Sequence, residues 1–407
     1  MMPACGLLGR KLGHSYSPAI HAMFGRYEYR LYEKEPEELE RFLREGGWDG
    51  LNVTIPYKKA VVPFCDELGD TAAATGSVNT LVRRADGTIF GDSTDASGFA
   101  YMVRLSGIDM AGEKVLVLGS GGASAAVCHA LKELRARPVV ISRSGPDHYG
   151  NLDRHRDAAV IVNATPVGMY PDNGRSPLSL DGFPSLRGVL DIVYNPARTA
   201  LLLDAEERGL ASAGGLSMLT AQAARSSELF TGIPVSDETV ARVTDRLEKQ
   251  TANVILVGMP GCGKTTVAEI LARRTGRDVL DSDREIVADA GRSIPEIFAA
   301  EGESSFRDRE TSVLRRLGSL SGRIIATGGG AVLREENYRP LHQNGVIFWL
   351  VRDLSALDRE GRPLSQNADL AAMFAAREPR YRRFADHVID NNGPPQETAD
   401  QILEVIL

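Results

Sequence analysis

The sequence has few cysteines, no long apolar run and no excess of basic charge. Its four cysteines, Cys5, Cys65, Cys128 and Cys262, are scattered without a C-x-x-C pair, so neither a disulfide framework nor a zinc site is indicated. No apolar run could span a membrane, and the first residues, MMPACGLLGRKLGHS, have too short an apolar run for a signal peptide. The formal charge of −7 divides into −4 for residues 1–250 (27 Lys+Arg, 31 Asp+Glu) and −3 for residues 251–407 (20 and 23). A nucleic-acid binder would be basic, so we expect no nucleic acid as a partner. With neither a signal peptide nor a membrane span, we expect a cytoplasmic protein that acts on small molecules and has no membrane partner.

Lysine is also scarce in the C-terminal part. From Thr251 to Leu407 there is one, Lys264, against nineteen arginines. It lies in GMPGCGKTT, between an apolar run and a helical pattern, as the strand–loop–helix motif G-x-x-x-x-G-K-[ST] requires. The motif predicts that Lys264 reaches the outer phosphates of ATP and that Thr265 binds Mg²⁺. The other ATP-binding residues would be Gly261, Cys262, Gly263 and Thr266. The alternative is a chance glycine turn, but the one lysine stands where phosphate chemistry needs a compact charge.

Polar side chains recur at the ends of predicted strands in residues 1–100. Two serines precede a helical run, an Asn-Val-Thr strand ends at a proline before two lysines, and an asparagine and two aspartates follow. These residues are Ser15, Ser17, Asn52, Thr54, Lys58, Lys59, Asn79, Asp92 and Asp95. Taken singly, the serines are helix caps and the lysines are solvated surface charges. Their repeated place at strand ends instead predicts one polar cleft.

A different pattern begins at Glu113. The apolar run Lys114–Leu118 leads into a glycine-rich turn and a helical stretch, and Pro138–Ser142 supplies a second strand. This order is typical of a dinucleotide-binding unit, whose turn contacts the pyrophosphate. The turn residues are Gly119, Ser120, Gly121, Gly122 and Ala123, and Ser124 stands where the usual motif has a third glycine.

Arg143 follows the second strand between two serines. NAD-binding units usually carry an acid at this point, and its charge would repel a 2′-phosphate. A cation with hydroxyl neighbours therefore favours NADP(H). The alternative is that Arg143 is only a surface cation.

The N-terminal part resembles shikimate dehydrogenase. The segments SYS, LNVTIPYK, SVNT and GDSTD occur in the order of that family, followed by NATPVGM, DIVYNP and GLSMLTAQAA, so the resemblance covers essentially residues 5–249. It implies that Lys58 and Asp95 form a catalytic pair in contact with the substrate, while Lys59 faces away. It also implies a substrate carboxylate at Ser15 and Ser17, ring hydroxyls at Thr54, Asn79 and Gln222, and a nicotinamide bordered by Tyr194 and Gly215. The family's usual Asn-Arg-Thr at the 2′-phosphate is Ser-Arg-Ser here.

Residues 252–394 resemble shikimate kinase, with the segments DSD, FRDRE, ATGGGA, EGRPLS and AAREPRY in family order after the glycine loop. The resemblance implies that Asp283 binds the ring hydroxyls and is the candidate base, and that Asp281 orients Mg²⁺ through water. The two aspartates are two residues apart, and we expect them on an extended segment, pointing the same way.

The same resemblance assigns the remaining polar residues of this part. Arg307, Arg377 and the Gly329 backbone would hold the substrate, since an arginine fork matches a carboxylate. Arg362 would close over ATP from a lid that is several residues shorter than in many relatives.

Together these patterns predict a bifunctional α/β enzyme of three domains. We expect a substrate-binding α/β domain (residues 1–100 and 217–249), a Rossmann NADP-binding domain (101–216) and a P-loop kinase domain with a central parallel sheet (253–407). The predicted reactions are NADPH-dependent reduction of 3-dehydroshikimate to shikimate, followed by Mg·ATP-dependent phosphorylation to shikimate 3-phosphate. The alternatives are a quinate-preferring dehydrogenase fused to another small-acid kinase, or a chain in which one half is a nucleotide sensor without catalysis.

Overall fold

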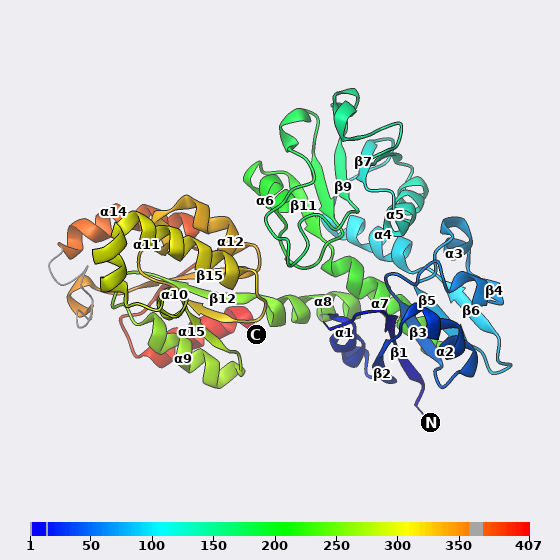
Figure 1. Cartoon of the computed structure of the whole chain (residues 1–407), viewed down its shortest axis with the longest axis horizontal. Helices are drawn as coiled ribbons and strands as arrows, with labels where there is room; N and C mark the ends of the chain where they lie inside the picture. The colour runs from blue at the N-terminus through cyan, green and yellow to red at the C-terminus, as the bar shows by residue number, and fades with distance from the viewer. Residues whose placement is uncertain (1, 14, 358–368) are drawn as a thin grey trace. The chain divides into compact units, whose positions relative to one another are not determined.

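The chain forms two compact units, each built around parallel strands and helices (Figure 1). The structure, a computed structural model, describes residues 2–13, 15–357 and 369–407. The first unit comprises Met1–Met169, Arg175–Tyr194 and Leu201–Leu247, and the second comprises Tyr170–Gly174, Asn195–Ala200 and Glu248–Leu407. Within the described ranges, no helix is both long enough and apolar enough to cross a membrane.

The first unit begins with a six-stranded sheet in the order β2-β1-β3-β5-β6-β4. The strands are β1 (Ala4–Gly9), β2 (Glu28–Glu33), β3 (Gly50–Val53), β4 (Glu67–Leu68), β5 (Thr80–Arg83) and β6 (Ile89–Asp92). The helices between them are α1 (Ser17–Phe24), α2 (Leu39–Glu45) and α3 (Asp70–Thr75). β1 pairs in parallel with β2 and β3, and the antiparallel β5 follows β3 in the sheet. The ends of β3 and β5 carry several of the polar residues that the sequence analysis grouped into one cleft.

A second, five-stranded parallel sheet follows in the same unit, in the order β11-β10-β9-β7-β8. Its strands are β7 (Lys114–Leu118), β8 (Arg137–Ile141), β9 (Val160–Asn163), β10 (Gly188–Asp191) and β11 (Ala211–Gly214), with helices α4 (Asp95–Ser106), α5 (Gly122–Glu133) and α6 (Ala200–Glu207). Val115 and Val117 lie in one apolar cluster and Leu116 and Leu118 in another, because successive side chains of a strand point to opposite faces. Both faces are therefore buried, as in doubly wound folds, and the predicted Rossmann domain is confirmed.

Helices α7 (Leu216–Thr231) and α8 (Asp237–Thr251) then return to the first sheet. Val240, Val243 and Leu247 of α8 are buried in a cluster that also contains Ile20 of α1 and Leu216 of α7. These α8 residues recur three and four positions apart, so they mark the packed face of α8.

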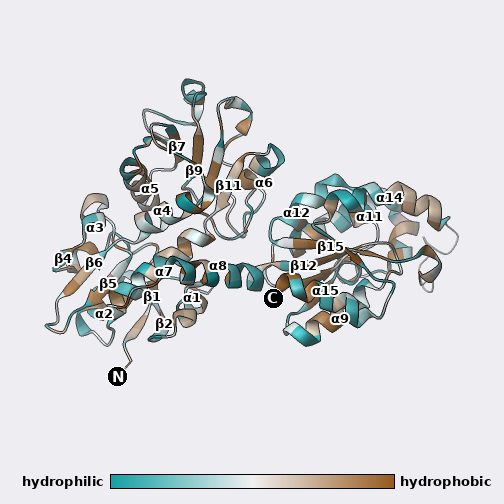
Figure 2. Cartoon of the chain, turned by 180° about the vertical axis from the view of Figure 1, so that it is seen from behind, coloured by the Kyte–Doolittle hydropathy of each residue, from teal (hydrophilic) through white to brown (hydrophobic). Residues whose placement is uncertain are grey.

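The second unit holds a five-stranded parallel sheet in the order β13-β14-β12-β15-β16. The strands are β12 (Asn253–Val257), β13 (Val279–Asp281), β14 (Ile324–Ala326), β15 (Gly345–Val351) and β16 (His387–Asp390). The helices are α9 (Lys264–Thr275), α10 (Ser282–Ala290), α11 (Ile294–Gly318), α12 (Tyr338–His342), α14 (Leu370–Phe384) and α15 (Pro395–Ile406). α9 and α15 pack together below the sheet in Figure 1, while α11 and α12 pack together above it. Every residue of β12 is buried, and Figure 2 shows apolar strands between helices with polar outer faces.

The last turn of α8 belongs to the second unit. The Arg277 guanidinium donates to the carbonyl oxygens of Lys249 (2.6 Å) and Ala252 (3.0 Å), and the Gly322 N–H donates to Thr251 O (2.7 Å). These donors satisfy carbonyls that a helix end leaves without intrahelical partners. Helix α8 therefore ends at Thr251, and a single residue, Ala252, separates it from β12.

Candidate active sites

A lysine–carboxylate pair lies at the start of α4 in the first unit. Lys58 Nζ donates to Asp95 Oδ2 at 2.8 Å, and Asn79 Nδ2 donates to Asp95 Oδ1 at 2.9 Å. The Asp95 side chain is 4% exposed and that of Lys58 is 25% exposed, so the lysine ammonium is the solvent-facing member of the pair. Lys59, next in the chain, is exposed. The carboxylate thus holds one ammonium proton in place and leaves others for a ligand.

A buried chain of hydroxyl and amide groups supports Asn79. The hydroxyl of Thr80 donates to Asn79 Oδ1 (3.0 Å) and lies 2.9 Å from Ser226 Oγ of α7. Ser226 Oγ in turn accepts from Asn52 Nδ2 at 2.8 Å, and Asn52 Oδ1 accepts from the Tyr29 hydroxyl at 2.8 Å. The chain ties α7 to strands β2, β3 and β5, which fixes the orientation of Asn79 beside the pair.

The other predicted substrate residues lie on neighbouring elements of the same unit. Ser15 and Ser17 lie at the start of α1, where Ser15 Oγ accepts from the Ser17 N–H at 3.2 Å. Thr54 directly follows β3, and its N–H donates to Leu8 O of β1. Gln222 lies on α7, which packs against both α1 and α4. Helix α7 thus packs on α4, the helix whose first residue is Asp95.

The glycine-rich turn after β7 has the conformation that a pyrophosphate contact needs. Gly119 has φ +104°, and a Cβ there would lie 2.9 Å from Thr165 Cγ2, so only glycine fits. Ser120 and Gly121 are exposed, and α5 begins at Gly122, followed by Ala123. The turn therefore presents backbone N–H groups and a helix N-terminus to solvent, which fits the pyrophosphate of NADP(H).

Ser124 is 2% exposed on the inner face of α5. Its small side chain is accommodated where the usual motif has glycine for close packing of helix and strand. The departure from the motif is therefore compatible with the fold.

Arg143 lies just after β8 with an exposed side chain, as a residue that reaches a 2′-phosphate must. Ser142 Oγ accepts from the Gly145 N–H at 2.8 Å and closes a tight turn around it. Asp147 follows in the same loop and lies 2.9 Å from His155 Nε2. The loop thus contains an acid as well as a base, a feature that the sequence analysis did not weigh.

The two residues expected at the nicotinamide lie at the ends of β10 and β11. The Tyr194 ring is 5.3 Å from the Tyr16 ring, between centroids, and Tyr16 stands between the two serines at the start of α1. Gly215 is buried, and a Cβ there would collide with the backbone of Ile192. Glycine at this place lets the start of α7 approach the strand that ends at Tyr194.

The glycine loop of the second unit, Gly258–Thr266, wraps around the Lys264 amine. Lys264 is 8% exposed and donates to the carbonyl oxygens of Gly258 (2.9 Å) and Met259 (3.0 Å). Gly261 and Gly263 have φ of +83° and +95°, which favours glycine, and α9 begins at Lys264. Cys262 is fully buried and Thr266 is exposed. The arrangement fits a nucleoside triphosphate: a glycine loop, a helix N-terminus and a lysine at its base.

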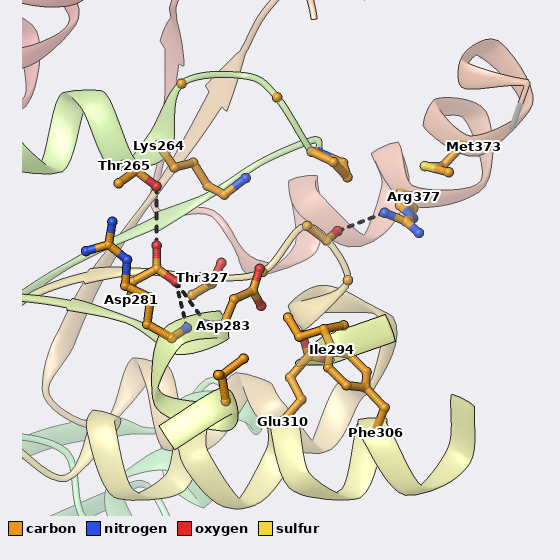
Figure 3. A pocket seen from close by; sticks show the side chains of 18 of the residues that line it. Lys264, Thr265, Asp281, Asp283, Ile294, Phe306, Glu310, Thr327, Met373 and Arg377 are labelled. Atoms are coloured by element: carbon orange, nitrogen blue, oxygen red, sulfur yellow. Dashed lines mark hydrogen bonds between the residues drawn. The ribbon is translucent and has the colours of Figure 1, made fainter. Parts of the chain in front are cut away.

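Thr265 and Asp281 face each other beside this loop. Thr265 Oγ1 lies 3.3 Å from Asp281 Oδ2, a pair of oxygens that suits a hydrated Mg²⁺ (Figure 3). The prediction that Asp281 and Asp283 share an extended segment is wrong. Asp281 ends β13 and caps α10, with Oδ1 accepting from the N–H groups of Asp283 (3.0 Å) and Arg284 (3.2 Å). Both aspartates nevertheless line the same pocket.

Arg377 lies across the pocket from Thr265 and Asp281 (Figure 3), and Arg307 lines the same pocket. Arg307 of α11 donates to Glu310 Oε2 at 2.7 Å, and Arg377 of α14 donates to Gly329 O at 3.0 Å. Gly329 itself lies against Pro260 of the glycine loop, with room for no side chain. Burial raises the pKa of the Glu310 carboxyl, and the adjacent Arg307 guanidinium opposes that rise. Glu310, which is 1% exposed, is a pocket residue that the sequence analysis missed.

These residues enclose one cavity of about 820 Å³. It extends from the glycine loop, past the two aspartates, to the arginines and to an apolar wall that includes Ile294, Phe298 and Phe306. A nucleotide and a small polar acid fit together in such a space. The remaining predicted ATP residue, Arg362, lies outside the described residues.

Fold and sites together define a two-part enzyme class: a dinucleotide-dependent dehydrogenase followed by a P-loop kinase. Comparisons with known proteins give the families. Residues 7–81 match the family model of the shikimate dehydrogenase substrate binding domain, and residues 260–407 match that of shikimate kinase.

Three relatives of the first unit illustrate the match. The NADP(+) shikimate dehydrogenase of Shouchella clausii is 36% identical over 267 residues, which cover 58% of this chain and 96% of that protein. The crystal structure of a chorismate mutase/shikimate 5-dehydrogenase fusion protein from Clostridium acetobutylicum is 35% identical with a TM-score of 0.58, covering 61% and 98% of the two chains. Shikimate 5-dehydrogenase of Thermus thermophilus, solved with NADP(H) and shikimate, is 33% identical with a TM-score of 0.55, covering 60% and 99%.

The chain belongs to the shikimate dehydrogenase family and carries a shikimate kinase domain at its C-terminus. It is thus a bifunctional shikimate-pathway enzyme that uses NADP(H), and ATP with Mg²⁺, as predicted. The predicted α/β fold is likewise confirmed.

Proposed function

We propose that the first unit reduces 3-dehydroshikimate with NADPH and that the second phosphorylates the resulting shikimate at the new hydroxyl. The observation that carries this proposal is the Lys58–Asp95 pair, held at 2.8 Å and backed by Asn79. Reduction of a ketone needs a proton donor beside the oxygen that gains negative charge. A solvent-facing ammonium fixed by a buried carboxylate is such a donor.

In the dehydrogenase half, bound NADPH supplies the hydride. Lys58 delivers a proton to the carbonyl oxygen, and Asp95 keeps the ammonium in place and offers its oxygens to a neighbouring ring hydroxyl. The other ring hydroxyls would be held by Thr54, Asn79 and Gln222. The hydroxyls of Ser15 and Ser17 would donate hydrogen bonds to the substrate carboxylate. Gly119–Ala123, Tyr194 and Gly215 would border the cofactor, with Arg143 at its 2′-phosphate.

In the kinase half, bound Mg·ATP supplies the phosphoryl group. Lys264 and the loop N–H groups of Gly261–Thr266 would stabilise the charge on the phosphates, and Thr265 and Asp281 would hold the metal and its waters. Asp283 lies between Asp281 and Arg377 in Figure 3, where it could accept the proton of the attacking hydroxyl. Arg307, Arg377 and Gly329 would hold the acid, and the Arg362 assignment stays a prediction.

The domain boundaries and the location belong to the same proposal. We assign the substrate domain to residues 1–100 and 217–249, the NADP domain to 101–216 and the kinase domain to 253–407. All four cysteines are free, which suits the reducing conditions of the cytoplasm.

One assay tests the proposed function. The chain is incubated with 3-dehydroshikimate, NADPH and Mg·ATP, and NADPH loss and ADP gain are followed separately. We expect NADPH loss without ATP present, and ADP gain only when shikimate is made or added. The dehydrogenase reaction is also run in the direction of oxidation, with NADP⁺ and either quinate or shikimate. A higher rate with quinate would support the quinate-preferring alternative. ADP formation that ignores shikimate would contradict the kinase assignment.

A further inference from the structure

Arg352 is a cation of the kinase pocket that no motif explains. It directly follows β15 and lines the 820 Å³ cavity together with the glycine loop. Its side chain is partly buried, and its Nε is shut off from solvent without any hydrogen-bond partner. Within the described part of the chain its guanidinium forms no ion pair or hydrogen bond. Arg307 and Arg377, which line the same pocket, differ, because Arg307 is paired with Glu310 and Arg377 with Gly329 O.

Arg352 lies next to Gly263, the last residue of the glycine loop before α9. A Cβ built on Gly263 would lie 3.6 Å from Arg352 Nη1 and 3.2 Å from Asn391 Nδ2. Gly263 directly precedes Lys264, the first residue of α9, so the guanidinium lies beside the N-terminal end of that helix. A helix N-terminus carries positive charge, so the Arg352 guanidinium and the helix end are two positive groups side by side.

Within the described residues, none of the acids that line the pocket forms an ion pair with Arg352. Asp281 is bonded to Thr265 and to two backbone N–H groups, and Glu310 is bonded to Arg307. A partly buried charge without a partner is unfavourable in the protein alone. The cost disappears when an anion occupies the space between the guanidinium and the helix end.

We propose that Arg352 binds a phosphate of the nucleotide, next to Gly263, and is a specific determinant of ATP and ADP affinity. This proposal rests on the kinase function proposed above. An arginine fork can bond two phosphate oxygens at once, whereas the Lys264 amine acts as a point charge. The contact exists in both the ground state and the transition state, so its loss raises KM for ATP and leaves kcat nearly unchanged.

The test uses the full chain with the substitutions Arg352→Gln and Arg352→Lys. The matched control is Arg273→Gln, which changes an exposed arginine in the last turn of α9. Affinities for ADP and for adenosine are measured by calorimetry, and KM for ATP and for shikimate by ADP formation. Thermal unfolding and NADPH oxidation show whether each variant is folded.

For Arg352→Gln we expect ADP affinity to fall about ten- to a hundredfold, the worth of a charge-assisted hydrogen bond. Adenosine affinity and the KM for shikimate should stay as in the wild type, because neither ligand brings a phosphate to this place. Arg352→Lys should recover part of the loss, and Arg273→Gln should show none.

Three results would overturn the proposal. Unchanged ADP affinity in a folded Arg352→Gln variant would remove Arg352 from the nucleotide site. An equal loss for adenosine would mean that the arginine contacts the base, and a loss confined to shikimate would make it a residue of the acid site. If the wild type failed to phosphorylate shikimate, the proposed function would fall, while the ADP titrations would still decide the role of Arg352.

Discussion

Lys58 Nζ lies 2.8 Å from Asp95 Oδ2, although the two residues are 37 positions apart in the sequence. The turn after β3 supplies the lysine and the first residue of α4 supplies the aspartate. This ion pair gives the first unit a proton donor at a defined position, the Lys58 ammonium, and the first prediction concerns its replacement.

Replacing Lys58 by alanine should lower kcat for 3-dehydroshikimate reduction by about 10²- to 10⁴-fold, the usual contribution of a positioned proton donor. Lys59→Ala is the matched control and should change little, because Lys59 is exposed. Steady-state NADPH oxidation measures both variants. Equal losses in the two would show that the catalytic lysine has been misassigned.

Arg143→Ala should weaken NADPH binding about ten- to a hundredfold, since a charge-assisted contact to phosphate contributes about 1.5–3 kcal/mol. NADH, which lacks the 2′-phosphate, should bind as before. Arg156→Ala removes another exposed arginine of the first unit and is the control. The comparison is the ratio of kcat/KM for NADPH to that for NADH, and an unchanged ratio would place Arg143 outside the cofactor site.

Lys264→Met should abolish ADP formation and leave NADPH oxidation intact. Methionine keeps most of the side-chain length but removes the charge that the phosphates need. The dehydrogenase activity of the same chain reports on folding of the first unit, and thermal unfolding reports on the second. Loss of both activities in a folded variant would contradict the assignment of two separate sites.

His21 gives the first unit a predictable response to acid. Burial lowers the pKa of its imidazole to about 3, and its Nδ1 lies 2.5 Å from the Tyr27 hydroxyl. In the unfolded chain the imidazole takes up a proton below about pH 6.5, whereas in the folded chain it stays neutral. The contribution of His21 to the free energy of unfolding is therefore fully present above pH 6.5. It is lost as the pH falls, by about 2 kcal/mol at pH 5.

The measurement is denaturant unfolding of the wild type and of His21→Gln at pH 8 and pH 5. The difference between the two pH values should be smaller by about 2 kcal/mol in the variant, whatever its stability at pH 8. His129→Gln changes a partly exposed histidine of α5 and is the control. Parallel stability curves for wild type and His21→Gln would show that His21 is not the acid-sensitive group.

Much of the fold follows from local sequence patterns. The buried run at β12, the glycine loop and the start of α9 form one continuous segment, so their order alone predicts a nucleotide site around Lys264. The same holds for Lys114–Leu118 and the turn after it. In both cases the ligand-binding groups are mainly backbone atoms, and a short motif fixes them.

The side-chain partners of the sites are less predictable, because they come from distant parts of the chain. Thr80 and Ser226 share a hydrogen bond across 146 positions, and no local pattern announces it. Glu310 could have been found, since it stands three residues after Arg307 on one helix, at the spacing of an ion pair. Asp281 shows the opposite error: alternation suggested a strand, but its side chain caps two N–H groups and so begins a helix there.

The burial of Lys264 has a chemical consequence beyond catalysis. From residue 251 onward its amine is the only one on a side chain, and it is enclosed by the carbonyls of Gly258 and Met259. A reagent that acylates primary amines therefore has one target in this part of the chain, and that target lies where the triphosphate would sit. Mass spectrometry of the peptide that contains Lys264 can then report the nucleotide occupancy of the unsubstituted enzyme without a coupled assay.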